Sequence, residues 1–266
     1  MGTTFPQLAA MIAFGLLALA AIVQAVYLLA RRPEPFSHWL LAAAGLLLVA
    51  GFVERSLRIR FAAVTNTFES LVFFAGVTAL VLFLYRLLAR QRLLPLVSFG
   101  GTVIALALLA LASSPLFPKE ALAPIPALQS YWLALHVTLS FIGESFFIVS
   151  FVASILYLSA RDEERLKRLD RLSYTAVGIG YPVFTAGALV FGAVWAQTAW
   201  GAWWSWDPKE TWALVTWLVY TAFLHTRLVK KLRGRLSAIL SIVGFVFTVF
   251  TFFGVNYLLS GLHSYG

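Results

Sequence analysis

Long apolar runs separated by short polar turns make up almost all of this 266-residue chain. A helix needs about 20 residues to cross the hydrocarbon layer of a bilayer, so runs of this length predict transmembrane helices. Eight stretches qualify, at residues 8–30, 38–56, 69–89, 93–113, 131–159, 173–198, 211–228 and 236–259. The pattern therefore predicts an all-α polytopic membrane protein with eight transmembrane helices, forming a single domain over residues 1–266.

The composition supports this interpretation. Hydrophobic residues make up 61% of the chain and charged residues 12%, against about 45–50% and about 25% in an ordinary soluble domain. The absence of cysteine excludes a disulfide, a thiol nucleophile and a thiolate metal ligand. The net charge of +9 arises from Lys and Arg residues that cluster in short loops, which indicates membrane topology rather than nucleic-acid binding.

The basic residues also predict an orientation. Most of them fall in alternate loops, at residues 31–32, 86–92, 161–171 and 227–235. Because loops rich in Lys and Arg stay in the cytoplasm, we expect a multi-pass protein of the inner (cytoplasmic) membrane with both termini on the outer side. The tryptophan-rich stretch 200–212 then also lies on the outer side.

Three arginines run against this trend. Arg55, Arg58 and Arg60 lie at the end of the second span or just after it and are expected on the outer side. They either pair with Glu54 and lipid phosphates or meet an anionic ligand at the outer face, and the sequence leaves both interpretations open.

The stretch WGAWWSWDPKETW, from Trp200 to Trp212, holds five of the nine tryptophans. One or two tryptophans there would be ordinary interfacial anchors. Asp207, Pro208 and Glu210 fit a helix start, with an N-cap, a proline at the first helical position and a capping-box glutamate. The two carboxylates are therefore expected to begin the seventh span rather than to act as acid–base catalysts.

Helix capping does not account for so many indole rings in one segment. Together they are expected to form a broad, flat, weakly polar surface, and Gly201 permits close approach of a ligand. Aromatic rings gain from stacking beyond the burial of their area. A planar apolar molecule suits such a surface, and among common cofactors the obvious candidate is a porphyrin.

A porphyrin iron takes axial ligands, and imidazole is a common one. His136 and His263 lie at the outer ends of the fifth and eighth spans, at the depth of the tryptophan segment. His225 follows Trp212 on the seventh span and lies about 20 Å from it along the helix, at about 1.5 Å per residue. It is either a functional residue within the membrane or snorkels to the interface beside Arg227. His38 is expected to be a helix-end residue near the cytoplasmic face. The histidines thus comprise an outer pair and one or two inner residues, a layout that suits moving a ligand between an inner and an outer station.

The segment WGAWWSWDPKETWALVTWLVY, the following LHTR and the terminal GVNYLLSGLHSYG resemble the tryptophan-rich signature of the cytochrome c assembly family of heme-handling membrane proteins, in its CcsA (ResC) branch. TNTFESLVF in the third span and LHVTLSF in the fifth add to the resemblance. It covers roughly residues 66–266, and the first two spans match only by position and hydrophobicity.

The resemblance implies a role in System II cytochrome c biogenesis. Members of this branch work with a second membrane protein, CcsB (ResB). They pass heme b (Fe-protoporphyrin IX) outward to apocytochrome c, whose CxxCH thiols add to the heme vinyl groups. The protein is thus expected to be a subunit of a holocytochrome c synthase (heme lyase) complex, in which the substrate brings the thiols.

Carried onto this chain, the resemblance implies iron ligation by His136 and His263 at the outer face and by His225 within the membrane. The CcsB-like partner would supply the other inner ligand. The heme platform is expected at Trp200, Gly201, Trp203, Trp204, Trp206 and Asp207. Heme propionates need cationic partners, for which the candidates are Arg55, Arg58, Arg60 and Lys209.

Two other functions remain open from the sequence. A HemX-like membrane regulator of heme synthesis would share helices and heme contact, and a heme exporter would move heme without attaching it. Loss of c-type cytochromes, as opposed to altered heme synthesis, separates the attachment role from the regulator. Glu144, about two turns below His136 in the fifth span, has no assigned role.

Overall fold

The computed structural model describes residues 4–88, 94–121 and 123–259. Within these ranges the regular elements are helices and there is no strand, which confirms the all-α prediction. Seven helical segments of the described chain are long and apolar enough to cross a membrane, and they correspond to predicted spans one to six and eight. The predicted seventh span is also helical, but the count of eight crossings stays a prediction.

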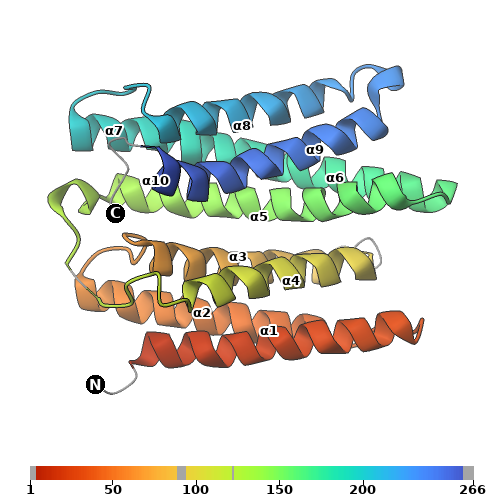
Figure 1. The fold of residues 1–266 in the computed structure, drawn as a ribbon, viewed down its shortest axis with the longest axis horizontal. Coiled ribbons are helices and arrows are strands. Elements are labelled where there is room, and N and C mark those ends of the chain that lie inside the picture. Colours follow the sequence, from red (N-terminus) through yellow and green to blue (C-terminus); the bar gives the residue numbers. More distant parts are fainter. Residues whose placement is uncertain (1–3, 89–93, 122, 260–266) are drawn as a thin grey trace. The chain divides into compact units, whose positions relative to one another are not determined.

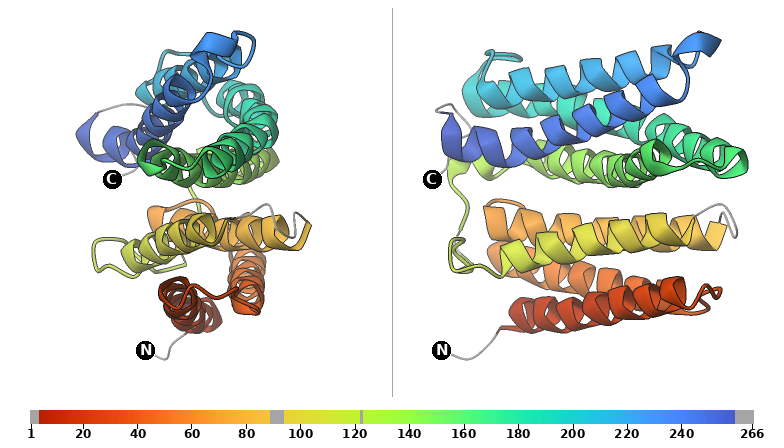
Figure 2. Two further views of the ribbon diagram at one scale, coloured as in Figure 1. Left: turned by 90° about the vertical axis from the view of Figure 1, so that its right-hand side faces the viewer. Right: turned by 45° about the vertical axis from the view of Figure 1, so that its right-hand side comes forward.

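The chain divides into two compact units, Met1–Tyr131 and Trp132–Gly266, and each is described by itself. In the first unit, α1 packs against α2 and α4, and α3 packs against the same two helices, so the four close into a bundle (Figures 1 and 2). The third and fourth helices pack against each other directly. The bounds are α1 Phe5–Leu29, α2 Ser37–Ile59, α3 Thr67–Leu88, α4 Pro95–Ala112 and the 3₁₀ turn η1 Pro126–Leu128.

The second unit is built around one unusually long helical run. Residues Glu163–Trp200 are helical over 38 residues, but a π-helix, η2, interrupts the α-helical bonding in the middle. The bounds are α5 Tyr131–Ser159, α6 Glu163–Phe184, η2 Thr185–Phe191, α7 Gly192–Trp200, α8 Pro208–His225, the 3₁₀ turn η3 Lys230–Leu232, α9 Arg235–Val249, the π-helix η4 Phe250–Gly254 and α10 Val255–Leu258. Figure 1 shows α5, α6, α8 and α9 running alongside one another.

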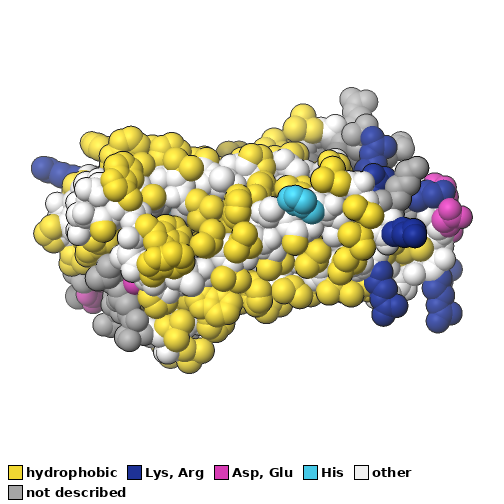
Figure 3. Space-filling view, turned by 90° about the horizontal axis from the view of Figure 1, so that it is seen from above, with side chains coloured by type: hydrophobic (Ala, Val, Ile, Leu, Met, Phe, Trp, Pro, Cys, Tyr) yellow, Lys and Arg dark blue, Asp and Glu magenta, His cyan; other side chains and the backbone are white. Residues whose placement is uncertain are grey.

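Hydrophobic side chains cover most of the face shown in Figure 3, and most of the visible Lys and Arg side chains gather at one end of it. An apolar belt with a charged end is the surface that a lipid bilayer requires, because the hydrocarbon layer cannot solvate charge.

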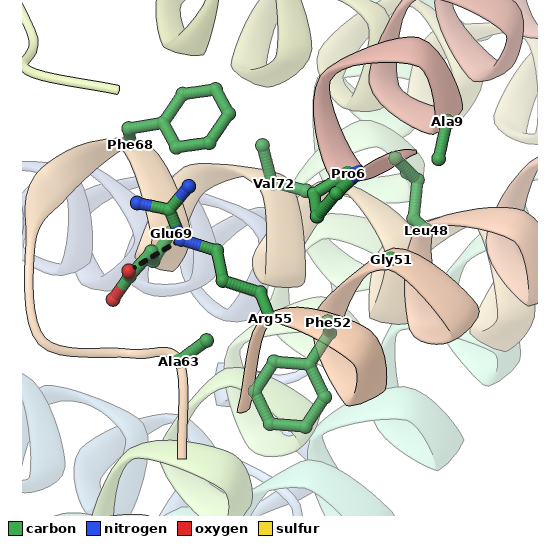
Figure 4. A pocket seen from close by; sticks show the side chains of 10 residues that line it. All are labelled: Pro6, Ala9, Leu48, Gly51, Phe52, Arg55, Ala63, Phe68, Glu69 and Val72. Carbon is green, nitrogen blue, oxygen red and sulfur yellow. Dashed lines mark hydrogen bonds and ion pairs between the residues drawn. The ribbon is translucent and has the colours of Figure 1, made fainter. Parts of the chain in front are cut away.

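A buried ion pair holds the first unit together at the end of α2. Arg55 Nε donates to Glu69 Oε1 over 2.6 Å, and the guanidinium also donates to the carbonyl oxygens of Lys119 and Glu120. Glu69 Oε2 accepts from both the backbone N–H and the hydroxyl of Thr65. Figure 4 shows Arg55 and Glu69 facing each other beside a small apolar pocket. Because both charges are enclosed and hydrogen-bonded, the pair is a structural lock between α2, α3 and the loop after α4.

Two of the three arginines have ion-pair partners within the first unit. Arg58 pairs with Glu54, one turn away on the surface of α2, as one interpretation expected. Arg55 pairs with Glu69 instead, so its guanidinium is already occupied inside the unit and the expectation that it meets an external anion is not supported. Arg60 is exposed and ends α2 in a left-handed conformation, with φ of 61°.

The two ion pairs of α2 give a matched test of stability. Glu69→Ala leaves Arg55 as an uncompensated buried charge, so we expect a loss of about 3–5 kcal/mol in the free energy of unfolding. Glu54→Ala removes the partner of a half-exposed pair and should cost at most about 1 kcal/mol. Thermal unfolding in mild detergent, followed by circular dichroism, measures both variants. Equal destabilisation by the two changes would contradict a special stabilising role for the Arg55–Glu69 pair.

Candidate functional site

His136 lies in the first turns of α5, where a second helix holds its imidazole ring. Its Nδ1 atom lies 2.9 Å from the carbonyl oxygen of Gly187 in η2. The ring also stacks on Trp195 of α7, with a centroid distance of 5.9 Å and an interplanar angle of 4°. The imidazole is half-buried, so it is fixed at one edge and on one face while part of it stays accessible.

Aromatic contacts continue on both sides of this histidine. One turn earlier on α5, Trp132 stacks on Phe191 with a centroid distance of 5.9 Å. On the other side, Trp195 meets Trp200 edge to face at 5.8 Å. Because Trp200 is the first residue of the tryptophan-rich segment, these contacts link His136 to that segment through Trp195.

Two residues with positive φ set the path of the tryptophan-rich segment. Gly201 ends α7 in the left-handed conformation, with φ of 76°, and has open space where a side chain would be. Trp206 adopts φ of 59°, which is uncommon for a bulky residue and costs free energy unless the surrounding structure compensates for it. Such strain is typical of functional segments.

The five tryptophans do not form one flat surface, which corrects that expectation. Trp203 and Trp206 are exposed, at 60% and 70%, whereas Trp212 packs inward on Phe250 with a centroid distance of 4.5 Å. The rings of Trp204 and Trp206 are nearly perpendicular, at 89°. The segment therefore presents two exposed indoles, and Trp200 and Trp212 pack against residues outside it. Heme contact by any of the five stays a prediction.

The acidic residues of the segment form the predicted helix start. Asp207 is the N-cap of α8 and accepts from the N–H of Lys209 over 2.9 Å, and Pro208 is the first helical residue. Glu210 Oε2 reaches back to the N–H of Asp207 and to that of Ser205. The capping box is thus confirmed, and both carboxylates are occupied in fixing where α8 begins.

The other histidines are held differently. His225, the last residue of α8, is exposed, and its Nδ1 lies 2.9 Å from the carbonyl oxygen of Thr221 in its own helix. His38 is the second residue of α2 and stacks on Phe83, so it is a helix-end residue as expected. His263 lies outside the described residues, and its pairing with His136 stays a prediction.

Sequence reasoning missed three residues around His136, namely Gly187, Gly192 and Trp195. The available signal was the run YPVFTAGALVFGAVW, in which Pro182 and two glycines interrupt an otherwise apolar helix. Glu144 is buried in α5, and its Oε2 atom has no hydrogen-bond partner among the described residues.

The donor set around His136 fits a heme iron. A carbonyl oxygen only accepts, so the Nδ1–Gly187 contact requires the hydrogen on Nδ1, and the lone pair of the neutral ring is then on Nε2. Iron-binding imidazoles commonly donate their other nitrogen to a carbonyl in this way. The exposed indoles of Trp203 and Trp206, in the segment that Trp200 begins, supply apolar, aromatic area of the kind on which a porphyrin stacks.

The fold and this site together define an α-helical membrane protein with an aromatic-lined histidine site in its second unit. Residues 64–263 match the family described as Cytochrome C assembly protein. The chain therefore belongs to the cytochrome c assembly protein family.

Its curated relatives are called Cytochrome c biogenesis protein CcsA. The protein of Chlamydomonas reinhardtii is 40% identical over 241 residues, which cover 85% of this chain and 67% of the relative. The protein of Prochlorococcus marinus (strain MIT 9303) is 35% identical over 318 residues, which cover 100% of this chain and 98% of the relative. The chain thus groups with CcsA proteins over its full length.

A solved structure titled Cytochrome c Heme Lyase CcmF is similar to the fold, with a TM-score of 0.64 and 20% sequence identity. The similarity covers 98% of this chain and 48% of that protein, so the chain spans about half the length of the larger protein. At this identity the similarity shows the fold alone.

The role of Asp207 can be tested by separating its charge from its hydrogen bond. Asparagine is as good an N-cap as aspartate, whereas alanine lacks the acceptor. We expect Asp207→Ala to lower the free energy of unfolding by about 1 kcal/mol, and Asp207→Asn to change it little. Thermal unfolding of the two variants measures the difference. A large loss in Asp207→Asn would mean that the negative charge has a role beyond capping.

Proposed function

We propose that this protein binds heme b at the outer face of the cytoplasmic membrane and presents it for covalent attachment to apocytochrome c. It acts in cytochrome c maturation as a subunit of a System II holocytochrome c synthase, together with a CcsB-like membrane partner. The observation that carries the proposal is the fixed imidazole of His136, held by Gly187 and Trp195 and joined to the tryptophan-rich segment.

The chemistry needs no nucleophile from this chain. The apocytochrome thiols add to the heme vinyl groups, so the protein has to hold the iron, orient the porphyrin and leave its vinyl edge accessible. A chain without cysteine suits that task. Two ligands, His136 and His263, would hold the iron until a histidine of the apocytochrome replaces one of them.

A second heme station within the membrane is supported by His225. This residue is exposed on α8, so a partner helix can reach it, and a CcsB-like protein would bring the second ligand. The predicted topology of eight crossings, with both termini outward, places His225 near the cytoplasmic side and His136 at the outer side. Heme would then travel from an inner site to an outer one.

The first experiment is to purify the chain with its CcsB-like partner and to record visible spectra, oxidised and reduced. In the wild type we expect a Soret band with low-spin α and β bands. His136→Ala should alter these bands and His225→Ala should lower the heme content, whereas His38→Ala, at a helix end of the first unit, should match the wild type. A wild-type complex that stays colourless after heme is supplied would sink the proposal.

Heme staining of c-type cytochromes in cells separates attachment from the competing roles. Loss of stained cytochromes in the His136→Ala strain supports attachment. Normal cytochromes with altered heme synthesis would instead indicate a HemX-like regulator, and heme export without any apocytochrome would indicate an exporter.

The exposed tryptophans offer a further test of the heme platform. Trp203→Ala and Trp206→Ala each remove an exposed ring, so the thermal midpoint should fall little while the bound heme per complex decreases. Trp212→Ala is the control for packing, because Trp212 contacts Phe247 and Phe250 of the second unit. Its loss should lower the thermal midpoint more than the loss of either exposed ring. Unchanged heme content in both exposed variants would assign these rings to interfacial anchoring.

A further inference from the structure

In the π-helix η2, one carbonyl oxygen accepts hydrogen bonds both from its own helix and from α5. In a π-helix the hydrogen bonds join residues five apart instead of four, and such turns are frequent at functional sites. Here the N–H of Gly192 donates to the carbonyl oxygen of Gly187. The same oxygen lies 2.9 Å from His136 Nδ1 on α5. Since a carbonyl has two lone pairs, this oxygen serves its own turn and the histidine together.

Two glycines make this contact sterically possible. A Cβ at Gly187 would overlap the backbone nitrogen of Ser140 and lie 2.7 Å from the carbonyl carbon of Leu139. A Cβ at Gly192 would lie 3.1 Å from His136 Nδ1 and 3.3 Å from its Cε1. The first glycine therefore lets the α5 backbone lie directly against η2, and the second leaves room for the imidazole ring.

Trp195 covers one face of the His136 ring. It follows Gly192 by three residues, which places it one turn further along α7. Its side chain is only 2% exposed, and its ring is parallel to that of His136 within 4°. Because Trp195 is fixed by burial, it limits how far the imidazole can tilt towards it, and the hydrogen bond to Gly187 opposes rotation of the ring about the Cβ–Cγ bond.

We infer that Gly187, Gly192 and Trp195 are positioning residues that hold His136 as the Nδ1–H tautomer, so that Nε2 is the iron-binding nitrogen. The inference rests on the proposed function, because it assumes that His136 is a heme ligand, and it goes further by naming what sets the tautomer and orientation of the ring. The hydrogen bond to Gly187 also makes Nε2 a stronger electron donor to the iron.

The first test compares two glycine variants of the chain in complex with its partner. Gly192→Ala places a methyl group against the imidazole, so we expect heme retention to fall by about 10-fold or more and the ferric low-spin electron paramagnetic resonance signal to shift. Gly178→Ala is the matched control, because a Cβ at Gly178 has no atom within 4 Å, and it should match the wild type. Wild-type signal and retention in a folded Gly192→Ala complex would overturn the inference.

The second test does not depend on the folding of Gly192→Ala. In His136→Gly, added imidazole can bind the iron and donate an N–H to Gly187, whereas 1-methylimidazole binds iron but has no N–H to donate. We expect imidazole to restore the low-spin spectrum at a concentration at least about 10-fold lower than the concentration of 1-methylimidazole that is needed. Equal rescue by both ligands would overturn the inference.

The two failures are distinguishable. If His136→Gly leaves the heme spectrum unchanged, His136 is not a ligand and the proposed outer site itself fails. If His136→Gly removes the low-spin signal but both ligands restore it equally, the outer site stands and the positioning role of Gly187 fails.

Discussion

The close backbone contact between α5 and the α6–η2 helix is the constraint on which the His136 site depends. Helices in a bilayer gain little from the hydrophobic effect when they associate, so small residues that let backbones approach are the usual means of packing. A Cβ at Gly143 would lie 2.7 Å from the backbone nitrogen of Phe184, and one at Gly180 would lie 2.8 Å from the carbonyl oxygen of Gly143. With Gly187, these glycines fix how α5 and α6–η2 are aligned, and that alignment brings His136 to the π-helix η2.

The second unit departs from regular α-helical geometry at several places. Pro182 lacks an N–H and so disrupts α-helical bonding in α6, and η2 begins three residues later. The second π-helix, η4, carries Phe250, on which Trp212 packs. Trp206 adds a backbone conformation that a bulky residue rarely takes. Local rules of helix geometry are broken where a site has to be shaped, which is where such departures are expected.

How far the sequence predicts the structure depends on the range of the interaction. Span positions follow from apolar length, and the start of α8 follows from Asp207 and Glu210, because both signals are local. The partner of Arg55 is Glu69, fourteen residues away on the next helix, and the sequence offered Glu54 as a nearer choice. The split of the tryptophan segment into exposed and packed rings likewise depends on α9 and η4, which no local pattern specifies.

In the first unit, one motif of the family resemblance has a structural role at the start of α3. TNTFESLVF contributed to the family resemblance, and in the structure Asn66 Oδ1 accepts from the N–H of Glu69 at the start of α3. Glu69 in turn holds Arg55 and Thr65. The family match begins at residue 64, yet the partner that satisfies Glu69 lies on α2, before the match. The second helix therefore supplies the ion-pair partner of this motif, although it lies outside the residues that the family model matches.

The two described candidate ligands differ in how firmly they are held. Both His136 and His225 place Nδ1 2.9 Å from a carbonyl oxygen, so both favour the tautomer with the lone pair on Nε2. For His136 that carbonyl belongs to another helix, and Trp195 covers one face of the ring. For His225 it belongs to the same helix, one turn earlier, and the residue is exposed. An imidazole fixed from two sides suits a site completed within this chain, whereas one fixed only by its own helix suits a site that a partner has to complete.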